Sequence, residues 1–254
     1  MEPGSAFVTS SHAVEGLREP GDTAETRTTI DASGGSELLE QRVIRFGPGR
    51  SAPRRHDHLQ EVLYVASGQG ALHLDSTKHE LEPDEGVFVV PGEVYEVENP
   101  TNDDIVVVSV TAPVGERGIG GNRRVTVRYA DQTPLPAAPN REFRYLVNED
   151  AGCLEITQFV GVIPPGKAPD HSHIYDEVIY VIEGDGIFHV DGTELPMHPG
   201  TCIHLPPRVL HCLENRGDRD LRVLGVFYPA GDPASRLEGD NKARASDVKA
   251  ESNR

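Results

Sequence analysis

The chain has 254 residues, enough for one large domain or two small ones, and a formal net charge of -17 with a pI of about 5.0. Surfaces that bind nucleic acid or anionic membranes need clustered Lys and Arg, so this charge balance argues against both partners. The 26 glycines and 20 prolines suit many short strands joined by tight turns, which predicts an all-β protein.

Signals for export, membrane insertion and disulfide bonding are weak in this sequence. The first 21 residues show no basic start followed by an apolar run, and the longest apolar stretches are too short to span a bilayer. The three cysteines, Cys153, Cys202 and Cys212, have no CxxC spacing and are expected to be buried thiols. These features favour a cytoplasmic protein.

The chain divides into five predicted segments. Residues 1–35 mix polar residues and glycines without apolar periodicity, which indicates a flexible arm. Residues 36–115 and 141–232 are rich in short β-type stretches and are expected to be two domains. Residues 116–140 are rich in Pro and Gly and are interpreted as a linker, and residues 233–254 alternate in charge like a disordered tail.

The two β-rich segments are copies of one unit. Glu61-Val62-Leu63-Tyr64-Val65 matches Glu177-Val178-Ile179-Tyr180-Val181 at an offset of 116 residues, and turn residues match at the same offset up to Asn99 and Asn215. Chance does not produce so many matches without a gap. Short strands at regular spacing, repeated twice, predict two small barrels or jelly rolls.

Four residues of the second unit have the character of metal ligands. His171 and His173 share one face of an extended strand because side chains alternate with a period of two, and Glu177 keeps the same parity. His211 follows a proline turn on a later strand. Three imidazoles and a carboxylate suit Fe, Mn, Ni, Co, Cu or Zn. The alternative, four buried but unrelated side chains, is disfavoured by their clustering.

These residues resemble the two motifs of the cupin family, G-x(5)-H-x-H-x(3,4)-E-x(6)-G and G-x(5)-P-x-G-x(2)-H-x(3)-N. The resemblance implies two tandem double-stranded β-helix, or jelly-roll, barrels, with one divalent transition metal held by His171, His173, Glu177 and His211. The second unit departs from the motifs twice. The spacing from Gly166 to His171 is one residue short, and Arg208 stands where the motif has glycine.

The first unit is expected to be degenerate as a metal site. The simplest alignment pairs Arg54 with His171 and His56 with His173, and in either alignment Tyr95 takes the place of His211. A fixed guanidinium repels a cation. The alternative alignment uses His56 and His58 as the histidine pair. It leaves open a second site of reduced affinity, which would consist of His56, His58, Glu61 and Tyr95.

Strand parity also predicts the lining of the second pocket. Residues in phase with Glu177 and His211 are apolar, which favours a small and partly hydrophobic ligand. They are Ile179, Val181, Val209 and Leu213. His204 is interpreted either as a partner that supports a metal ligand or as a surface imidazole.

The resemblance implies several functions for the second barrel. The ligand set is similar to that of quercetin dioxygenase-like and germin-like cupins, which favours a metal-dependent oxidoreductase with Glu177 as the catalytic base. A metal-dependent isomerase, hydrolase or decarboxylase is one alternative, and a non-catalytic small-molecule or sugar-binding cupin is another. The expected partner is a small molecule, and assembly as a homodimer is left open.

Overall fold

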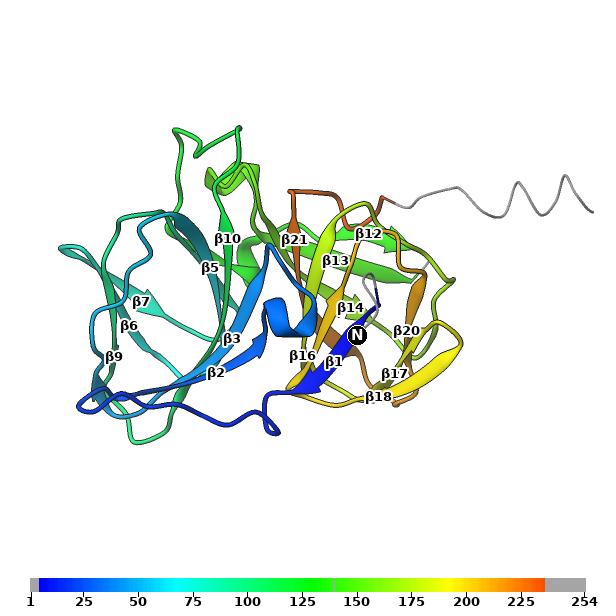
Figure 1. Cartoon of the computed structure of the whole chain (residues 1–254), viewed down its shortest axis with the longest axis horizontal. Helices are drawn as coiled ribbons and strands as arrows, with labels where there is room; N and C mark the ends of the chain where they lie inside the picture. The colour runs from blue at the N-terminus through cyan, green and yellow to red at the C-terminus, as the bar shows by residue number, and fades with distance from the viewer. Residues whose placement is uncertain (1–4, 139, 236–254) are drawn as a thin grey trace, which may run out of the picture.

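Each half of the chain folds into an antiparallel β-barrel, as the repeat predicted (Figure 1). The structure, a computed structural model, describes residues 5–138 and 140–235. Each barrel has one large and one small sheet. Within the described residues, no helix is long and apolar enough to cross a membrane.

The first barrel combines a six-stranded sheet, in the order β11-β8-β5-β10-β3-β2, with a four-stranded sheet, β4-β9-β6-β7. The bounds of its strands are β2 Ala24–Ile30, β3 Glu40–Phe46, β4 Gly49–Arg50, β5 Leu59–Ser67, β6 Gly70–Leu74, β7 Thr77–Leu81, β8 Glu85–Val89, β9 Tyr95–Asn99, β10 Ile105–Pro113 and β11 Thr126–Arg128. Two short 3-10 helices, η1 Ala32–Gly34 and η2 Tyr129–Asp131, lie between strands.

The second barrel combines a seven-stranded sheet, β1-β19-β16-β21-β14-β13-β12, with a four-stranded sheet, β15-β20-β17-β18. The bounds of its elements are β1 Phe7–Ser10, β12 Leu135–Ala138, β13 Arg141–Val147, η3 Glu149–Ala151, β14 Thr157–Ile163, β15 Gly166–Lys167, β16 Asp176–Glu183, β17 Gly186–Val190, β18 Thr193–Met197, β19 Thr201–Leu205, β20 His211–Asn215 and β21 Leu221–Tyr228.

Strand β5 shows how alternation builds both the barrel interior and the contact between barrels. Leu63 and Val65 point into the interior of the first barrel, whereas Val62 and Tyr64 belong to a second apolar cluster outside it. This is the period-two pattern of a strand buried on both faces. The repeat of β5 in β16 places Val178 and Tyr180 in the same outer cluster.

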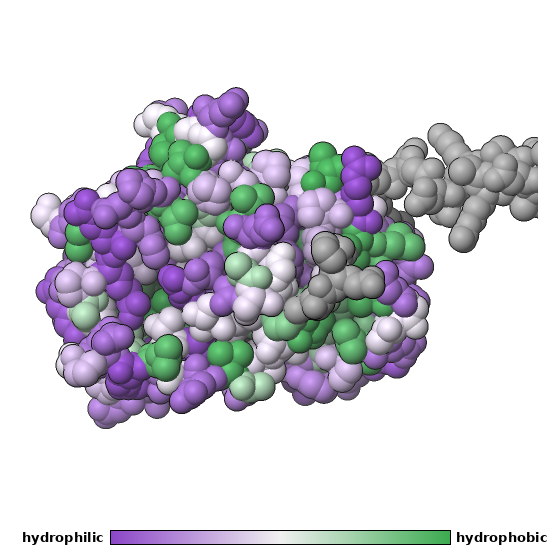
Figure 2. All heavy atoms as spheres, in the orientation of Figure 1, coloured by the Kyte–Doolittle hydropathy of each residue, from purple (hydrophilic) through white to green (hydrophobic). Residues whose placement is uncertain are grey.

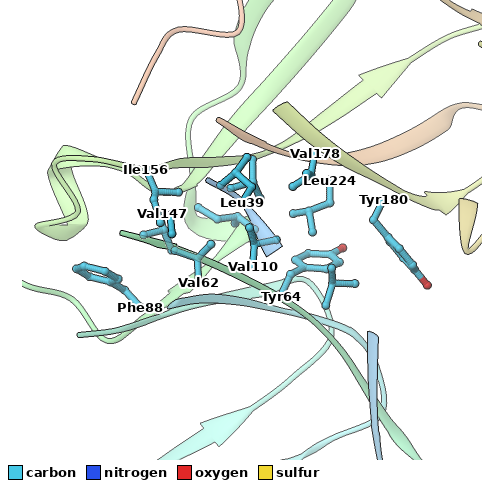
Figure 3. Packing of buried hydrophobic residues seen from close by; sticks show 14 of the residues in the cluster. Leu39, Val62, Tyr64, Phe88, Val110, Val147, Ile156, Val178, Tyr180 and Leu224 are labelled. Atoms are coloured by element: carbon cyan, nitrogen blue, oxygen red, sulfur yellow. The ribbon is translucent and has the colours of Figure 1, made fainter. Parts of the chain in front are cut away.

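The outer cluster is the interface between the two barrels (Figure 3). Val62 and Val110 of the first barrel pack there with Val178 and Leu224 of the second, and all four are fully buried. A polar contact adds to it, because Arg222 Nη2 donates a hydrogen bond of 2.9 Å to Asp84 Oδ1. Burial of this apolar area makes the two barrels a single packed unit.

The arm and the linker differ from their sequence prediction, because both contain strands. Residues 7–10 form β1 and residues 24–30 form β2, and both β11 and β12 lie within the predicted linker. The prediction of a flexible arm over residues 1–35 is thus contradicted for its described part. Of the predicted tail, residues 233–235 are described, and residues 236–254 lie outside the described residues.

Strands β1 and β11 are exchanged between the barrels. Strand β1 precedes the first barrel in the chain but pairs with β19 of the second barrel, and Figure 1 shows it there. Strand β11 precedes the second barrel but pairs with β8 of the first. Strands β8 and β19 are repeat partners, so both edges are covered in the same way. An unpaired edge strand would otherwise expose its backbone hydrogen-bonding groups.

Equivalent turns of the two barrels share a left-handed backbone. Gly68 and Gly184 have φ of 81° and 87° at matching turns. Gly92 has φ of 88°, and its counterpart Arg208 has φ of 69°. Only glycine adopts this region without steric cost, so Arg208 carries local strain at the motif position where glycine is usual.

Candidate metal centre

The three predicted histidines of the second barrel lie together. His171 and His211 form an isolated antiparallel bridge with two backbone hydrogen bonds of 2.9 Å. His173 is held two residues further on, where its carbonyl accepts a hydrogen bond of 2.6 Å from the Arg208 amide. Potential ligand atoms of the three side chains all lie within 4.8 Å of one another. The alternation of side chains along the 171–173 segment therefore brings both rings to His211.

Backbone carbonyls orient all three imidazoles. Nδ1 of His171 lies 3.2 Å from the Pro169 carbonyl oxygen, Nδ1 of His173 lies 3.1 Å from that of Ser235, and Nδ1 of His211 lies 2.9 Å from that of Val209. A carbonyl can only accept, so each Nδ1 carries the proton and each Nε2 carries the lone pair. Supporting contacts of this kind fix the tautomer that a metal ligand needs.

Burial favours the neutral form of His211. It lowers the pKa of this imidazole to about 3, with a further contribution from the neighbouring His171. The desolvated imidazole is therefore unprotonated at neutral pH and available as a donor. The three rings form mutual contacts, with centroid separations of 4.4 Å for His171 and His211 and 5.0 Å for His171 and His173.

Glu177 lies in the wall of the same pocket, at the beginning of β16. It falls outside the group of three side chains whose ligand atoms approach within 4.8 Å, so the structure brings together three of the four expected ligands and places the fourth nearby. Burial, reinforced by the negative charge of Asp176, raises the pKa of Glu177 to about 8. Its Oε2 is buried and has no hydrogen-bond partner among the described residues.

The chemistry of the whole donor set, the Glu177 carboxyl together with the three-histidine cluster, fits a cation. A buried carboxylate without a hydrogen bond or counter-ion is costly, and a divalent metal beside it would supply the missing charge. Three imidazoles, each oriented by a backbone carbonyl at Nδ1, form the rest of a nitrogen-rich donor set. Such a set suits transition metals better than Mg²⁺ or Ca²⁺, which prefer oxygen ligands.

The pocket beyond the histidines is mainly apolar and has a cavity volume of about 90 Å³. Ile179 and Leu213 line it, as strand parity predicted. Val181 and Val209 instead pack in the apolar interior of the barrel, because inward parity alone does not bring a side chain to the pocket. The pocket is also lined by Phe143, Phe159, Phe227, Arg141, Glu142 and Gly225.

The first barrel repeats this geometry with different chemistry. Arg54 forms the antiparallel bridge with Tyr95 that His171 forms with His211, which confirms the simpler of the two alignments. The Arg54 guanidinium turns to Asp22, 3.1 Å away, and lies 5.5 Å from the centre of the Phe46 ring. The alternative alignment through His58 is wrong, since His58 is exposed at a bend before β5.

Hydroxyl groups bond to one oxygen of the first-barrel carboxylate, whereas Glu61 Oε2 is buried without a hydrogen-bond partner among the described residues, as Glu177 Oε2 is. Glu61 Oε1 accepts hydrogen bonds from the Tyr95 hydroxyl, at 3.1 Å, and from the Ser109 hydroxyl. His56 Nε2 is 3.7 Å from Glu61 Oε2. Burial and the negative charge of Glu61 raise the pKa of Tyr95 well above its usual value, so its hydroxyl remains a donor. Of the second site considered from the sequence, His56, Glu61 and Tyr95 gather and His58 does not.

Two supporting features were missed or left undecided from the sequence. His204 is 1% exposed and its Nε2 is 2.7 Å from Asp176 Oδ1, so the surface interpretation is wrong. Asp176 directly precedes Glu177 in the chain, and its contact with His204 joins β19 to the beginning of β16. Ser235, in the predicted tail, supplies the carbonyl for His173. A backbone contact of this kind leaves no signal in the sequence.

A family comparison decides what kind of protein carries this site. The family model described as Cupin domain matches residues 42–111 and residues 159–227, together more than half of the chain. The chain belongs to the cupin family. Each match covers one barrel, so the cupin is a two-barrel member with its three-histidine cluster in the second.

Solved structures share this two-barrel cupin fold across most of their length. The Escherichia coli protein Ylba superposes with a TM-score of 0.76 at 12% identity, covering 91% of this chain and 93% of that one. A putative glyoxylate-induced protein of Pseudomonas aeruginosa gives 0.76 at 19% identity, with 91% and 92% covered. An oxalate decarboxylase variant of Bacillus subtilis gives 0.72 at 15% identity, with 87% and 77% covered.

Curated relatives match shorter segments of the cupin. An uncharacterised protein of Methanocaldococcus jannaschii is 33% identical over 70 residues, 27% of this chain and 56% of the relative. The oxalate-binding protein of Thermotoga maritima is 33% identical over 89 residues, 34% of this chain and 74% of the relative. Auxin-binding protein 1 of Arabidopsis thaliana is 29% identical over 86 residues, 30% of this chain and 43% of the relative.

Proposed function

We propose that the second barrel binds one divalent transition metal through His171, His173, Glu177 and His211, and that the cupin is a metal-dependent oxidoreductase of the dioxygenase type. The observation that carries the metal assignment is the cluster of three oriented imidazoles, whose ligand atoms lie within 4.8 Å of one another in a pocket that Glu177 also lines. Four protein ligands leave room in the coordination sphere for a small organic substrate. When bound, a redox-active metal such as iron or manganese would supply Lewis acidity and electron transfer.

The protein's own groups have distinct roles in this proposal. The backbone carbonyls hold the three imidazoles in one tautomer, and the apolar wall excludes water from the substrate. Glu177 is the group suited to accept a proton from the substrate, because a carboxylate beside a metal can exchange coordination for proton transfer. The first barrel contributes no ligands to the centre and is assigned a structural role.

The experiment is a metal analysis of the purified chain followed by assays for oxygen uptake. We expect one metal per chain. When the metal is iron or manganese, we also expect consumption of molecular oxygen in the presence of an organic substrate that chelates the metal through its own oxygen atoms. Two tightly bound metals per chain would contradict the assignment to one barrel. Turnover that continues without oxygen would contradict the oxidoreductase function and favour an isomerase, hydrolase or decarboxylase instead.

A second candidate is a non-catalytic cupin that holds a small organic anion at the same centre. The match to the Thermotoga maritima oxalate-binding protein, which spans 74% of that relative, favours it. Both candidates use the same metal centre and differ in turnover. Tight binding of a ligand by the metal-loaded chain, with no product after prolonged incubation, would favour the binding protein.

A further inference from the structure

Three phenylalanines distinguish the second pocket from its copy in the first barrel. The residues that line the second pocket are Phe143, Phe159 and Phe227, and those at the same places in the first barrel are Thr26, Arg42 and Thr111. The rings contact one another, with centroids 6.0 Å apart for Phe143 and Phe159 and 5.0 Å apart for Phe159 and Phe227. They form a continuous aromatic wall.

Strand register establishes which residues correspond. Phe143 lies opposite Gly161 between β13 and β14, as Thr26 lies opposite Ile44 between β2 and β3. In the same way, Phe159 of β14 pairs with Gly225 of β21, and Arg42 of β3 pairs with Ser109 of β10 at the matching place in the first barrel. On the same strands, Phe227 pairs with Thr157 in the second barrel, and Thr111 pairs with Glu40 in the first.

The aromatic wall is therefore not a requirement of the fold, since the first barrel closes with polar residues at all three places. Gly225 supports the same conclusion, because a Cβ there would lie 2.3 Å from the Phe159 ring. A serine occupies that position in the first barrel, where its hydroxyl bonds to Glu61. In the second barrel, glycine at position 225 thus leaves the space that the Phe159 ring occupies in the pocket.

The rest of the pocket, as far as the described residues form it, offers few polar contacts to a ligand. Apart from the four proposed metal ligands, its charged lining residues within ranges 5–138 and 140–235 are Arg141 and Glu142. The Arg141 guanidinium donates to the backbone carbonyls of Gly166 and Leu213, at 3.2 and 3.3 Å. Figure 2 shows hydrophobic side chains gathered over the second-barrel end of the molecule in that view. A ligand body placed against the three rings thus gains by being apolar.

Resting on the proposed metal function, we propose that the substrate class is a small organic acid or enol with one aromatic ring. Its adjacent oxygen atoms would bind at the metal centre, and its ring would pack against Phe143, Phe159 and Phe227. The cavity of about 90 Å³ is small beside the roughly 300–1,000 Å³ of pockets for drug-sized ligands, which limits the body to a single ring. A fully polar dicarboxylate would place its second carboxylate against hydrocarbon.

The test compares two 2-oxo acids with the same chelating head, phenylpyruvate and pyruvate, with oxalate as the polar reference. The full chain is loaded with zinc, which is redox-inert, its zinc content is measured, and binding is followed by calorimetry. We expect phenylpyruvate to bind at least tenfold more tightly than pyruvate or oxalate. Equal or tighter binding of pyruvate or oxalate by the zinc-loaded chain overturns the aromatic class and leaves the metal function standing. A chain that takes up no zinc overturns the metal function and this inference with it.

Variants that place first-barrel residues at the matching positions of the second barrel test whether the three phenylalanines cause the preference for phenylpyruvate. Phe143→Thr and Phe227→Thr are each expected to reduce the preference for phenylpyruvate over pyruvate at least threefold while zinc content stays at one per chain. Thr26→Phe, which adds a ring at the matching place of the first barrel, should leave the preference unchanged. A preference that persists in both second-barrel variants, with folding verified by circular dichroism, overturns the assignment to this wall. The ratio measured on the native chain decides the ligand class even if a variant fails to fold.

Discussion

Arg54 and Tyr95 exchange two backbone hydrogen bonds, 2.8 and 3.0 Å long, in the first barrel. His171 and His211 form the same exchange in the second. The two barrels thus present different side chains from one backbone frame. This makes the chain its own control, because a residue of one barrel can be transplanted to the matching place in the other.

The substitution His211→Tyr should abolish the metal centre without unfolding the barrel. The first barrel already accommodates a buried tyrosine at this place, and the change removes one of four proposed ligands. We expect metal affinity to fall at least a hundredfold, measured by competition with a chromogenic chelator. Tyr95→Ala is the control, and its metal content should equal that of the native chain. Retention of full metal by the His211→Tyr chain would show that tyrosine can serve as a ligand and that the first barrel can bind metal.

Metal uptake should release a proton from Glu177. In the metal-free protein burial raises the pKa of this carboxyl to about 8, so it is protonated at pH 7 and must lose its proton to act as a ligand. Metal affinity should therefore increase with pH up to about 8 and level off above it. Calorimetry at pH 7 in buffers of different ionisation enthalpy should give close to one proton released per metal. Glu177→Gln should bind more weakly and release none, whereas equal release from that variant would assign the proton to another group.

The strained backbone at Arg208 predicts a stabilising substitution. Its φ of 69° costs a residue with a Cβ about 1–2 kcal/mol, and glycine at the matching position 92 avoids that cost. Greater freedom of glycine in the unfolded chain offsets part of the gain. Arg208→Gly should raise the free energy of unfolding by about 0.5–1 kcal/mol in urea titrations. Arg208→Ala keeps the Cβ and should give no such gain, so equal stabilisation by both would remove strain as the cause.

The interface between the barrels should make them unfold together. Leu224 is fully buried in the cluster shared by both barrels, so Leu224→Ala should destabilise the chain by about 2–5 kcal/mol. A single transition by two probes, near-ultraviolet circular dichroism and tyrosine fluorescence, is expected for the native chain. Leu210→Ala is the control, since Leu210 is 56% exposed and its loss should change stability by less than about 0.5 kcal/mol. Two separate transitions in the native chain would contradict the cooperative interface.

The sequence repeat was sufficient to predict both barrels because strands such as β5 and β16 are buried on both faces and keep nearly the same residues. The outer strands were harder to detect. Strand β2 reads Ala-Glu-Thr-Arg-Thr-Thr-Ile and is half-exposed along much of its length, so it lacks a clear apolar alternation. Its counterpart β13 is offset by 117 residues rather than 116, because one residue is inserted between Gly49 and Glu61.

The clustering of the three histidines was predictable from the sequence, and the surroundings of the cluster were less so. The spacing of His171, His173 and His211 carried the metal assignment, and the structure brings these side chains together. The orientation of the rings depends on carbonyls of Pro169, Val209 and Ser235, which any residue type could provide. Likewise, the burial of His204 follows from the packing of β19 between β1 and β16, a pairing that involves distant parts of the chain.

The exchange of β1 and β11 bears on how such a chain can originate. A gene that encoded one repeat would specify a polypeptide whose first strand pairs with the edge strand of a second copy. The first strand of that second copy would pair with the edge strand of the first in the same way. Two identical subunits related by a twofold axis would therefore interlock, and joining their genes would leave the contacts unchanged. After fusion the halves can accumulate different mutations. One half can then change without loss of the other, and Arg54 and Tyr95 stand in this chain where the second half has His171 and His211.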